Sequence, residues 1–277
     1  MIFDTHCHAY MKGLGNRKPD VLRNMHAVGV TRSIQIGTGL EKSRVALDLA
    51  REWGADTWCT AGIHPTGCQD LPQNSVPELM TQFEELVQGN LDKMVGIGET
   101  GFDYFHVTRG KATEQKQTQR VFFAAQVELS LKVNLPLIIH TRDAADDTVA
   151  LLKERGVRRA VIHCYSENPP FAERLLDWSD SIYFSFSGIL TYARSVQVQE
   201  TARMLPLNRI LVETDAPFLV PQAVRDRFST NEPAFTRYVM DYLKTLRPEP
   251  AEEVEQTVWN NSNKFFGIME CGSKLPL

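Results

Sequence analysis

The sequence predicts an α/β protein that folds as a closed (β/α)₈ barrel, the TIM barrel architecture. Short apolar runs bounded by Gly, Pro or polar residues recur along the chain, with helical segments between them. Successive runs are spaced by about 30 residues, the length of one βα unit. Residues able to bind metal or catalyse reactions follow nearly every run, and a parallel barrel gathers these strand ends on one face. A closed barrel is therefore favoured over an open doubly wound sheet, the main alternative.

Strand and helix are expected to alternate strictly along the chain. The strands are expected at 2–5, 33–36, 58–61, 94–97, 137–139, 160–162, 182–186 and 210–212. The clearest helices between and after them are expected at 41–53, 114–133, 143–154, 232–246 and 251–266. The first of these places Val45, Leu47 and Leu49 among charged residues, and 143–154 opens with an acidic turn that suits a helix N-terminus. Such alternation indicates a parallel sheet.

The chain carries no Ser/Gly-rich linker, charge block or low-complexity tract that would divide it. We therefore expect a single barrel domain over residues 1–270, followed by a short tail at 271–277. Eight βα units consume nearly all of the 277 residues, which leaves no room for a separate DNA-binding domain.

Composition excludes several classes of protein. The 30 Lys and Arg residues against 34 Asp and Glu residues give a net charge of −4, so no general positive field attracts nucleic acid, although a local anion site stays open. The five Cys residues are scattered without a repeated short spacing, which fits neither a disulfide scaffold nor a Cys-only zinc site. No apolar run approaches a membrane span, and no secretory leader is recognisable. These features predict a cytoplasmic protein without membrane contact.

Histidines and carboxylates stand at the ends of the predicted strands. They are His6 and His8 after the first strand, His64 after the third, Glu99 after the fourth, His140 and His163 at the fifth and sixth, and Asp215 after the eighth. Because alternate strand residues point to the same side, His6 and His8 can share one ion while Cys7 points away. All these side chains are expected to converge on one pocket.

A His-x-His pair alone is a weak signal for a metal site. Burying four imidazoles and two carboxylates together without a metal would, however, be costly. Six ligands exceed the needs of one tetrahedral ion and divide into two sets that share a carboxylate. Imidazole with carboxylate suits zinc, and carboxylate with water suits magnesium or manganese, so the sequence predicts two divalent ions of open identity.

Several ordered segments carry a family resemblance that spans nearly the whole chain. They are residues 3–8 (FDTHCH), 62–65 (GIHP), 96–104 (GIGETGFDY), 139–144 (IHTRDA), 162–165 (IHCY), 185–188 (SFSG), 211–218 (LVETDAPF) and 231–233 (NEP). With them the chain resembles the TatD-like metal-dependent hydrolases, often described as deoxyribonucleases. It departs from the family at Phe102, where Leu is frequent, and at Thr66, where a second His is frequent.

The resemblance implies a barrel of the metallo-dependent hydrolase type with a binuclear centre. His6, His8 and Asp215 would hold one ion, His140 and His163 the other, and Glu99 would bridge them. The implied activity is hydrolysis of DNA phosphodiester bonds, with single strands or ends preferred. Thr66 removes the support for a substrate contact from that position.

Further roles are argued residue by residue. Asp215 is the candidate that orients the nucleophilic water and accepts its proton. Glu213 is expected to orient a histidine ligand or to act as a catalytic base itself. His64 is assigned to substrate phosphate or to the transition state, with a purely structural histidine as the alternative. Arg142 either contacts a phosphate or pairs with Asp143 or Asp146.

Weaker signals surround these positions. Ser185, Ser187 and Gly188 lie where many barrels bind phosphate, and Ser187 is taken as the substrate contact. Asp103 is expected to support the site or to fix its loop, and the 220–231 loop with Arg225 and Arg227 either covers the mouth or is solvated. Cys7 and Cys164 are expected to point away and pack, and the tryptophans to lie in the core. Tyr104 and Phe105 are the candidates for stacking on bases.

Three functions are compatible with these residues. The first is a nuclease that uses water at a binuclear metal centre. The second keeps the centre but hydrolyses another bond, since related barrels cleave amides, lactones or phosphotriesters. The third is a protein that binds nucleic-acid ends or a protein partner with little turnover. The sequence predicts neither the oligomeric state nor the choice among DNA, RNA and small phosphodiesters.

Overall fold

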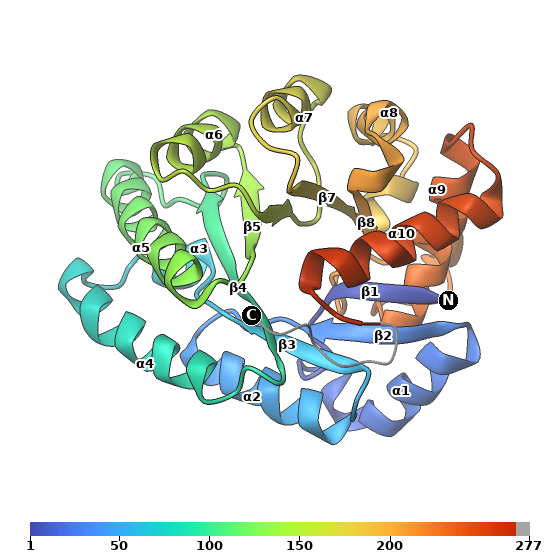
Figure 1. Ribbon diagram of the computed structural model, residues 1–277, viewed down its shortest axis with the longest axis horizontal. Helices are drawn as coiled ribbons and strands as arrows, with labels where there is room; N and C mark the ends of the chain where they lie inside the picture. The colour runs from blue at the N-terminus through green and yellow to red at the C-terminus, as the bar shows by residue number, and fades with distance from the viewer. Residues whose placement is uncertain (270–277) are drawn as a thin grey trace.

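Eight parallel strands, hydrogen-bonded in chain order, form the wall of a nearly closed barrel (Figure 1). They are β1 Ile2–Cys7, β2 Val30–Gln35, β3 Thr57–Ala61, β4 Met94–Asp103, β5 Leu137–Arg142, β6 Ala160–Ile162, β7 Ile182–Phe186 and β8 Ile210–Val212. The computed structural model describes residues 1–269, so the tail predicted at 271–277 lies outside the described residues. The predicted barrel is confirmed.

Helices cover the outside of the barrel. They are α1 Lys18–Ala27, α2 Leu40–Glu52, α3 Pro65–Cys68, α4 Val76–Gln88, α5 Ala112–Val133, α6 Ala145–Glu154, α7 Pro169–Leu176, α8 Val196–Met204, α9 Thr236–Leu246 and α10 Ala251–Phe266. Short 3₁₀ turns lie at Gly15–Arg17, Gln73–Ser75, Gly188–Thr191, Leu207–Arg209, Gln222–Val224 and Pro233–Phe235. α9 therefore begins four residues later than predicted, because the 3₁₀ turn over Pro233–Phe235 precedes it.

The barrel closes beyond the end of β8, at the level of the strand termini. Cys7 and Ala216 form an isolated parallel bridge. The backbone N–H of Asp215 donates to the His6 carbonyl at 2.9 Å, and that of His8 donates to the Ala216 carbonyl at 2.7 Å. The segment after β8 is thereby fixed against the residues that end β1.

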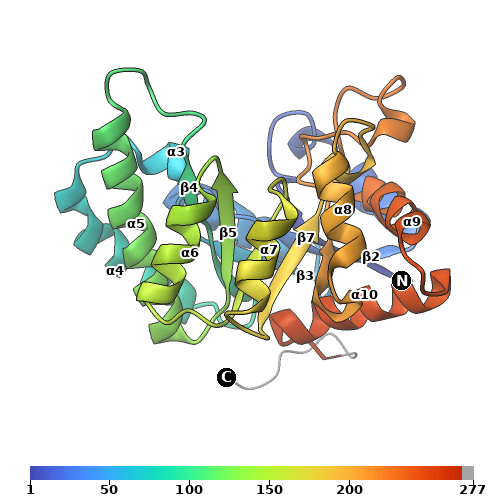
Figure 2. The same cartoon turned by 90° about the horizontal axis from the view of Figure 1, so that it is seen from above.

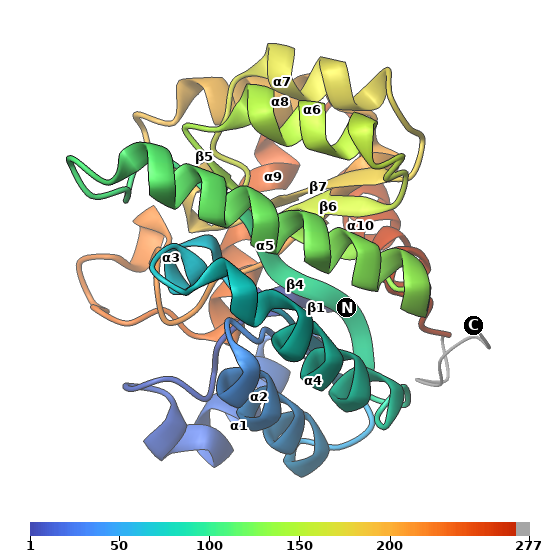
Figure 3. The same cartoon turned by 90° about the vertical axis from the view of Figure 1, so that its left-hand side faces the viewer.

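Two apolar layers stabilise the wall. The larger lies between the strands and the helices, and Figure 3 shows α5 alongside β4 and α4 on that side. The second lies inside the barrel, where Phe3, Trp58 and Tyr183 pack against Trp259 and Phe266 of α10. Figure 2 shows α10 beneath the amino ends of the strands. One end of the barrel is therefore filled with apolar side chains, while the carboxyl ends stay free for a site.

β4 is longer than the sequence predicts, because its pairing with β5 shifts register between Ile97 and Thr100 and then continues to Asp103. Gly98 and Gly101 flank Glu99 in this stretch, both with positive φ. A Cβ on Gly101 would stand 1.9 Å from the His140 carbonyl oxygen. Only glycine permits this close approach of β4 to β5, and Glu99 therefore lies within the strand rather than after it.

Among the described residues, no helix combines the length and apolar character that crossing a bilayer requires.

Candidate metal centre

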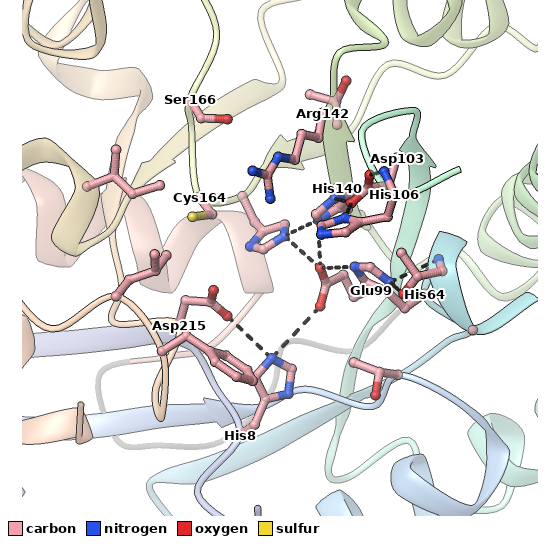
Figure 4. A pocket seen from close by; sticks show the side chains of 18 of the residues that line it. His8, His64, Glu99, Asp103, His106, His140, Arg142, Cys164, Ser166 and Asp215 are labelled. Atoms are coloured by element: carbon pink, nitrogen blue, oxygen red, sulfur yellow. Dashed lines mark hydrogen bonds and ion pairs between the residues drawn. The ribbon is translucent and has the colours of Figure 1, made fainter. Parts of the chain in front are cut away.

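A cavity of about 750 Å³ opens at the carboxyl ends of the strands. Figure 4 shows side chains from β4, β5 and the segments after β1, β3, β6 and β8 turned toward one another around it. The titratable residues that line it are His8, Lys42, His64, Glu99, Asp103, His106, His140, Arg142, His163, Cys164 and Asp215. The structure thus brings together residues separated by more than two hundred positions.

Glu99 lies at the centre of this group. Its Oε1 is 2.8 Å from His163 Nε2, 3.0 Å from His140 Nδ1 and 3.2 Å from His64 Nε2. Its Oε2 is 3.5 Å from His6 Nε2 and 3.9 Å from His8 Nε2. One carboxylate oxygen therefore faces three imidazoles and the other faces two, which is the arrangement of a carboxylate shared between two ligand groups.

Asp215 faces the histidines of β1. Its Oδ1 is 3.4 Å from His8 Nε2 and 3.6 Å from His6 Nε2. Ligand atoms lie within 4.8 Å of one another in three groups: His6, His8 and Asp215; His6, Glu99 and His163; and His64, Glu99 and His140. The first group contains the three residues that the resemblance assigned to one ion. The third adds His64 to the neighbours of Glu99, which the sequence did not predict.

Hydrogen bonds on the outer side of three histidines set their tautomers. His8 Nδ1 lies 3.0 Å from the Ile36 carbonyl oxygen, His163 Nδ1 lies 3.3 Å from Glu213 Oε1, and His140 Nε2 lies 3.0 Å from Asp103 Oδ2. Carbonyl and ionised carboxylate oxygens only accept, so each outer nitrogen carries the proton. The inner nitrogens of His140 and His163 face Glu99 and that of His8 faces Asp215, so each can give its lone pair to an ion bound there while the outer nitrogen keeps its proton.

His6 supplies the test of whether a metal fits. It is fully buried, neither of its ring nitrogens has a hydrogen-bond partner, and its ring stacks on His163 with centroids 3.9 Å apart. Buried polar atoms are normally paired, and an unpaired one costs about 1–3 kcal/mol. A divalent ion between His6 and the two carboxylates would give a His6 ring nitrogen the partner that it lacks. The donor set of imidazole and carboxylate suits zinc or manganese, with magnesium on the carboxylates.

The charges in the site are strongly coupled. Burial alone would raise the pKa of Glu99, but His163 and His64 hold it well below its usual value. Burial likewise opposes ionisation of Asp215, and its contacts with His8 and His6 outweigh burial and lower its pKa. Burial lowers the pKa of His6. The carboxylates are therefore ionised and His6 neutral, the forms that bind metal.

Two further carboxylates contact cavity histidines from behind. Glu213 is buried, contacts His163 Nδ1, and accepts a hydrogen bond from the Cys164 backbone N–H at 2.7 Å. Asp103 accepts from His140 and also from the backbone and ring of His106, at 2.9 and 2.8 Å. This geometry supports the positioning role for Glu213, and Asp103 both supports the site and fixes its loop.

The structure places Cys164 differently from the prediction, and Ser187 lies beside it. Cys164 was expected to point away, but it lines the cavity, because β6 ends at Ile162 and Cys164 turns the chain with φ +44°. Alternation therefore does not apply beyond the strand. Ser187 is buried, does not line the cavity, and lies 3.1 Å from the Cys164 sulfur. Its position gives no support to the predicted phosphate contact.

Other predicted residues lie around the mouth. Arg142 lines the cavity with its guanidinium 3.9 Å from the Phe105 ring centroid. Among the described residues it forms no ion pair with Asp143 or Asp146. Tyr104 is engaged elsewhere, since its hydroxyl donates to Asp147 at 2.5 Å. Arg225 and Arg227 are not among the residues that line the cavity.

As expected, Cys7 packs in an apolar cluster, and the tryptophans are buried or pack on the core.

Sequence reasoning missed the glutamines of α5. Gln126 accepts from the Ile63 backbone N–H at 2.7 Å and donates to the Thr100 hydroxyl at 2.6 Å, next to His64 and Glu99. Gln119 binds the backbone N–H and carbonyl of Asp103, both at 2.9 Å. The signal was available: two glutamines seven residues apart fall on the same, buried face of an amphipathic helix.

A TIM barrel whose strand ends gather histidines and carboxylates defines a class, the metal-dependent hydrolases. Within that class, a family model described as TatD related DNase matches residues 3–267, and the chain belongs to the TatD family. The chain is 33% identical over 272 residues to the uncharacterized metal-dependent hydrolase YcfH of Escherichia coli K12, covering 96% of each protein. It is 30% identical over 270 residues to the uncharacterized metal-dependent hydrolase YabD of Bacillus subtilis, covering 97% of this chain and 100% of that one.

A solved structure agrees with this assignment. The crystal structure of YjjV, a TatD homologue from Escherichia coli K12, superposes with a TM-score of 0.86 at 26% identity, covering 97% of this chain and 98% of that one. The likeness extends over the barrel and the helices around it. The chain is thus a TatD-family metal-dependent hydrolase.

Proposed function

We propose that this protein hydrolyses phosphodiester bonds of DNA, acting on single strands or ends, with water as the nucleophile. The observation that carries the proposal is the central position of Glu99, whose two oxygens face different histidines on opposite sides of one cavity. The DNase description of the matched family supplies the substrate class. We further propose that the protein acts in the cytoplasm, and the four described cysteines are free.

His6, His8 and Asp215 are proposed to hold one divalent ion and His140 and His163 the other, with Glu99 shared between them. Bound ions at such a site lower the pKa of a water molecule and stabilise negative charge on phosphate oxygens. Two ions contribute +4 and the two carboxylates −2, which leaves about +2 in the cavity. This local charge attracts a phosphate even though the whole chain carries −4.

The protein's own residues supply the remaining steps. Asp215 lies at the cavity wall with Oδ1 toward His6 and His8, and it orients the attacking water and accepts its proton. Glu213 holds His163 through Nδ1. Arg142 reaches the cavity from the end of β5 and binds a substrate phosphate, with Phe105 fixing the plane of its guanidinium.

The test uses protein stripped of metal by a chelator. It is incubated with end-labelled single-stranded DNA, double-stranded DNA and RNA under separate magnesium, manganese and zinc supplements, and the product ladder is read from each end. We expect metal-dependent DNA cleavage that inorganic phosphate inhibits. Because only a few phosphates are bound, the salt dependence should be shallow.

Variants exclude contaminating nuclease. Glu99→Gln and Asp215→Asn should each lower DNA cleavage by a factor of about 10³ or more, since both remove a ligand carboxylate from the centre. Glu41→Gln, a change at an exposed residue, is the matched control and should cleave like the wild type. Unchanged cleavage by both site variants with metal supplied would show that this centre does not cut DNA. Cleavage of an ester or amide but not of DNA would assign the same centre to another bond.

A further inference from the structure

His64 differs from the other cavity histidines in what holds its outer nitrogen. The outer nitrogens of His8, His140 and His163 face oxygens that accept hydrogen bonds. The outer nitrogen of His64, Nδ1, instead faces Thr66, whose backbone N–H donates to it at 3.2 Å and whose hydroxyl lies 2.7 Å away. His64 is the N-cap residue of α3, and its ring caps the helix.

This contact makes the outer nitrogen of His64 an acceptor, whereas the outer nitrogens of the other three rings are donors. A backbone N–H can only donate, so Nδ1 of His64 must present its lone pair to Thr66. The single proton of the ring is then on Nε2, which lies 3.2 Å from Glu99 Oε1. A carboxylate oxygen accepts, so both ends of the ring agree on the same tautomer. An N–H directed into the site cannot ligate a metal, because ligation needs the lone pair.

We propose that His64 is a neutral hydrogen-bond donor to the substrate rather than a metal ligand, and that Thr66 is the positioning residue that fixes its tautomer. His64 lines the cavity, and its Nε2–H, which faces Glu99 Oε1 in this structure, lies at the wall where a substrate phosphate would bind. A donor fixed in place stabilises the charge that develops on a phosphate oxygen in the transition state. No proton is transferred, and His64 keeps its Nε2–H throughout. The substrate part of this inference rests on the proposed function.

The inference also accounts for Thr66. Fixing the tautomer of His64 requires only a backbone N–H at position 66, which every residue except proline provides. The hydroxyl adds a second contact to Nδ1 but is not needed for the tautomer. A side chain at this position therefore acts through His64 and need not touch substrate.

The first test counts metal ions. His64→Ala and His64→Gln proteins are loaded with zinc or manganese, freed of excess, and their metal content is measured by mass spectrometry. We expect both to hold as many ions as the wild type, whereas His140→Gln, the comparison variant at a ligand, holds fewer. Loss of an ion from both His64 variants would make His64 a ligand and overturn the proposal.

The second test measures cleavage by the same variants. Removing one transition-state donor typically lowers kcat by about 10²–10³-fold, which is the loss we expect for His64→Ala with KM changed far less. Gln places an amide N–H near the position of Nε2, so His64→Gln should recover part of that loss. Equal losses in Ala and Gln variants would contradict a donor role.

The third test observes the tautomer directly and does not depend on any activity. Spectra of ¹⁵N-histidine-labelled protein should show His64 protonated on Nε2, with the signal assigned by its absence in His64→Gln. Thr66→Val keeps the backbone N–H and should keep this tautomer, while Thr66→Pro removes the donor and should lose it. α7 begins with Pro169 and Pro170, so this fold already tolerates a helix that opens with two prolines.

The outcomes separate the two proposals. A wild-type His64 protonated on Nδ1 would overturn the inference whatever the protein cleaves. If the tautomer and the metal count are as expected but DNA is not cleaved, the DNase proposal fails while the assignment of His64 as a fixed donor stands.

Discussion

The two ends of the barrel use the same strands in opposite ways. At the amino ends, Phe3 and Trp58 pack against Trp259 and Phe266 of α10, and the buried guanidinium of Arg32 is paired with Asp56 and stacked over tryptophan rings. At the carboxyl ends, buried histidines and carboxylates face a cavity, and neither ring nitrogen of His6 has a hydrogen-bond partner. The apolar end stabilises the fold, whereas the polar end costs stability unless a ligand completes it.

β1 shows this division within a single strand. Phe3 belongs to the apolar layer, and His6 follows it three residues later in the candidate metal centre. Substitutions at the amino end should therefore change stability and leave metal binding intact. Substitutions at the carboxyl end should instead change metal binding.

The largest expected effect is that of Phe266→Ala in α10. Phe266 is buried against Phe3 and Phe265, with ring centroids 6.2 and 4.8 Å away. Truncation should lower the free energy of unfolding by about 3–5 kcal/mol. Chemical denaturation measures this loss, and the folded fraction should bind as many metal ions as the wild type. Phe228→Ala, at a half-exposed ring, is the control. A lower metal count in folded Phe266→Ala would show that the two ends are not independent.

His6→Leu should raise the free energy of unfolding of the metal-free protein, whereas Phe266→Ala lowers it. It removes two buried ring nitrogens that have no hydrogen-bond partner, each the kind of group whose burial costs about 1–3 kcal/mol. We expect the metal-free variant to be more stable than metal-free wild type by an amount in that range. Adding metal should raise the melting temperature of the wild type and not of the variant. A less stable metal-free variant would mean that His6 stabilises the fold by itself.

Glu213→Gln tests a residue that supports the centre from outside. Loss of a carboxylate that holds a ligand histidine typically lowers metal affinity by about 10–100-fold, and Asp103→Asn should behave alike through His140. Competition with a chelator measures the affinity. At saturating metal, turnover by Glu213→Gln should approach that of the wild type. A large loss of kcat at saturating metal would instead assign Glu213 as a catalytic base.

The smallest effect is expected at Glu255 on α10. Burial alone would raise its pKa, but hydrogen bonds from Lys244 and Arg237 lower it to about 2. Because the folded pKa lies below the usual value of 4.5, this contribution to stability is present above about pH 5 and is lost as the pH falls toward 2. Glu255→Gln should lower stability at pH 7 by about 1 kcal/mol or less, and by less still at pH 3. Thermal unfolding at the two pH values measures this, and a difference that grows toward pH 3 would contradict it.

Most of the fold could be predicted because each strand is a short apolar run. β6, β7 and β8 begin and end where the sequence predicts. β4 could not be delimited, because its extension past Ile97 depends on pairing with β5 across a register shift at Gly98 and Glu99. Register is a property of two strands, and a single run of sequence does not contain it.

The same limit applies around the site. The six predicted ligand residues converge because all parallel strands end on one face, a rule that needs only their positions in the sequence. Cys164 was misplaced because β6 ends before His163, and no alternation rule extends into the turn that follows.

The sequence by itself determined the barrel, the face on which the site lies and the residue types that converge there, because periodicity and strand-end positions are local properties of the chain. Only the tertiary structure decided which oxygen of Glu99 faces which histidine, and that the outer nitrogen of His140 faces Asp103 while that of His64 accepts from the Thr66 backbone N–H. Those distinctions arise from contacts between segments distant in sequence and from the positions of backbone groups, which residue identity alone does not determine.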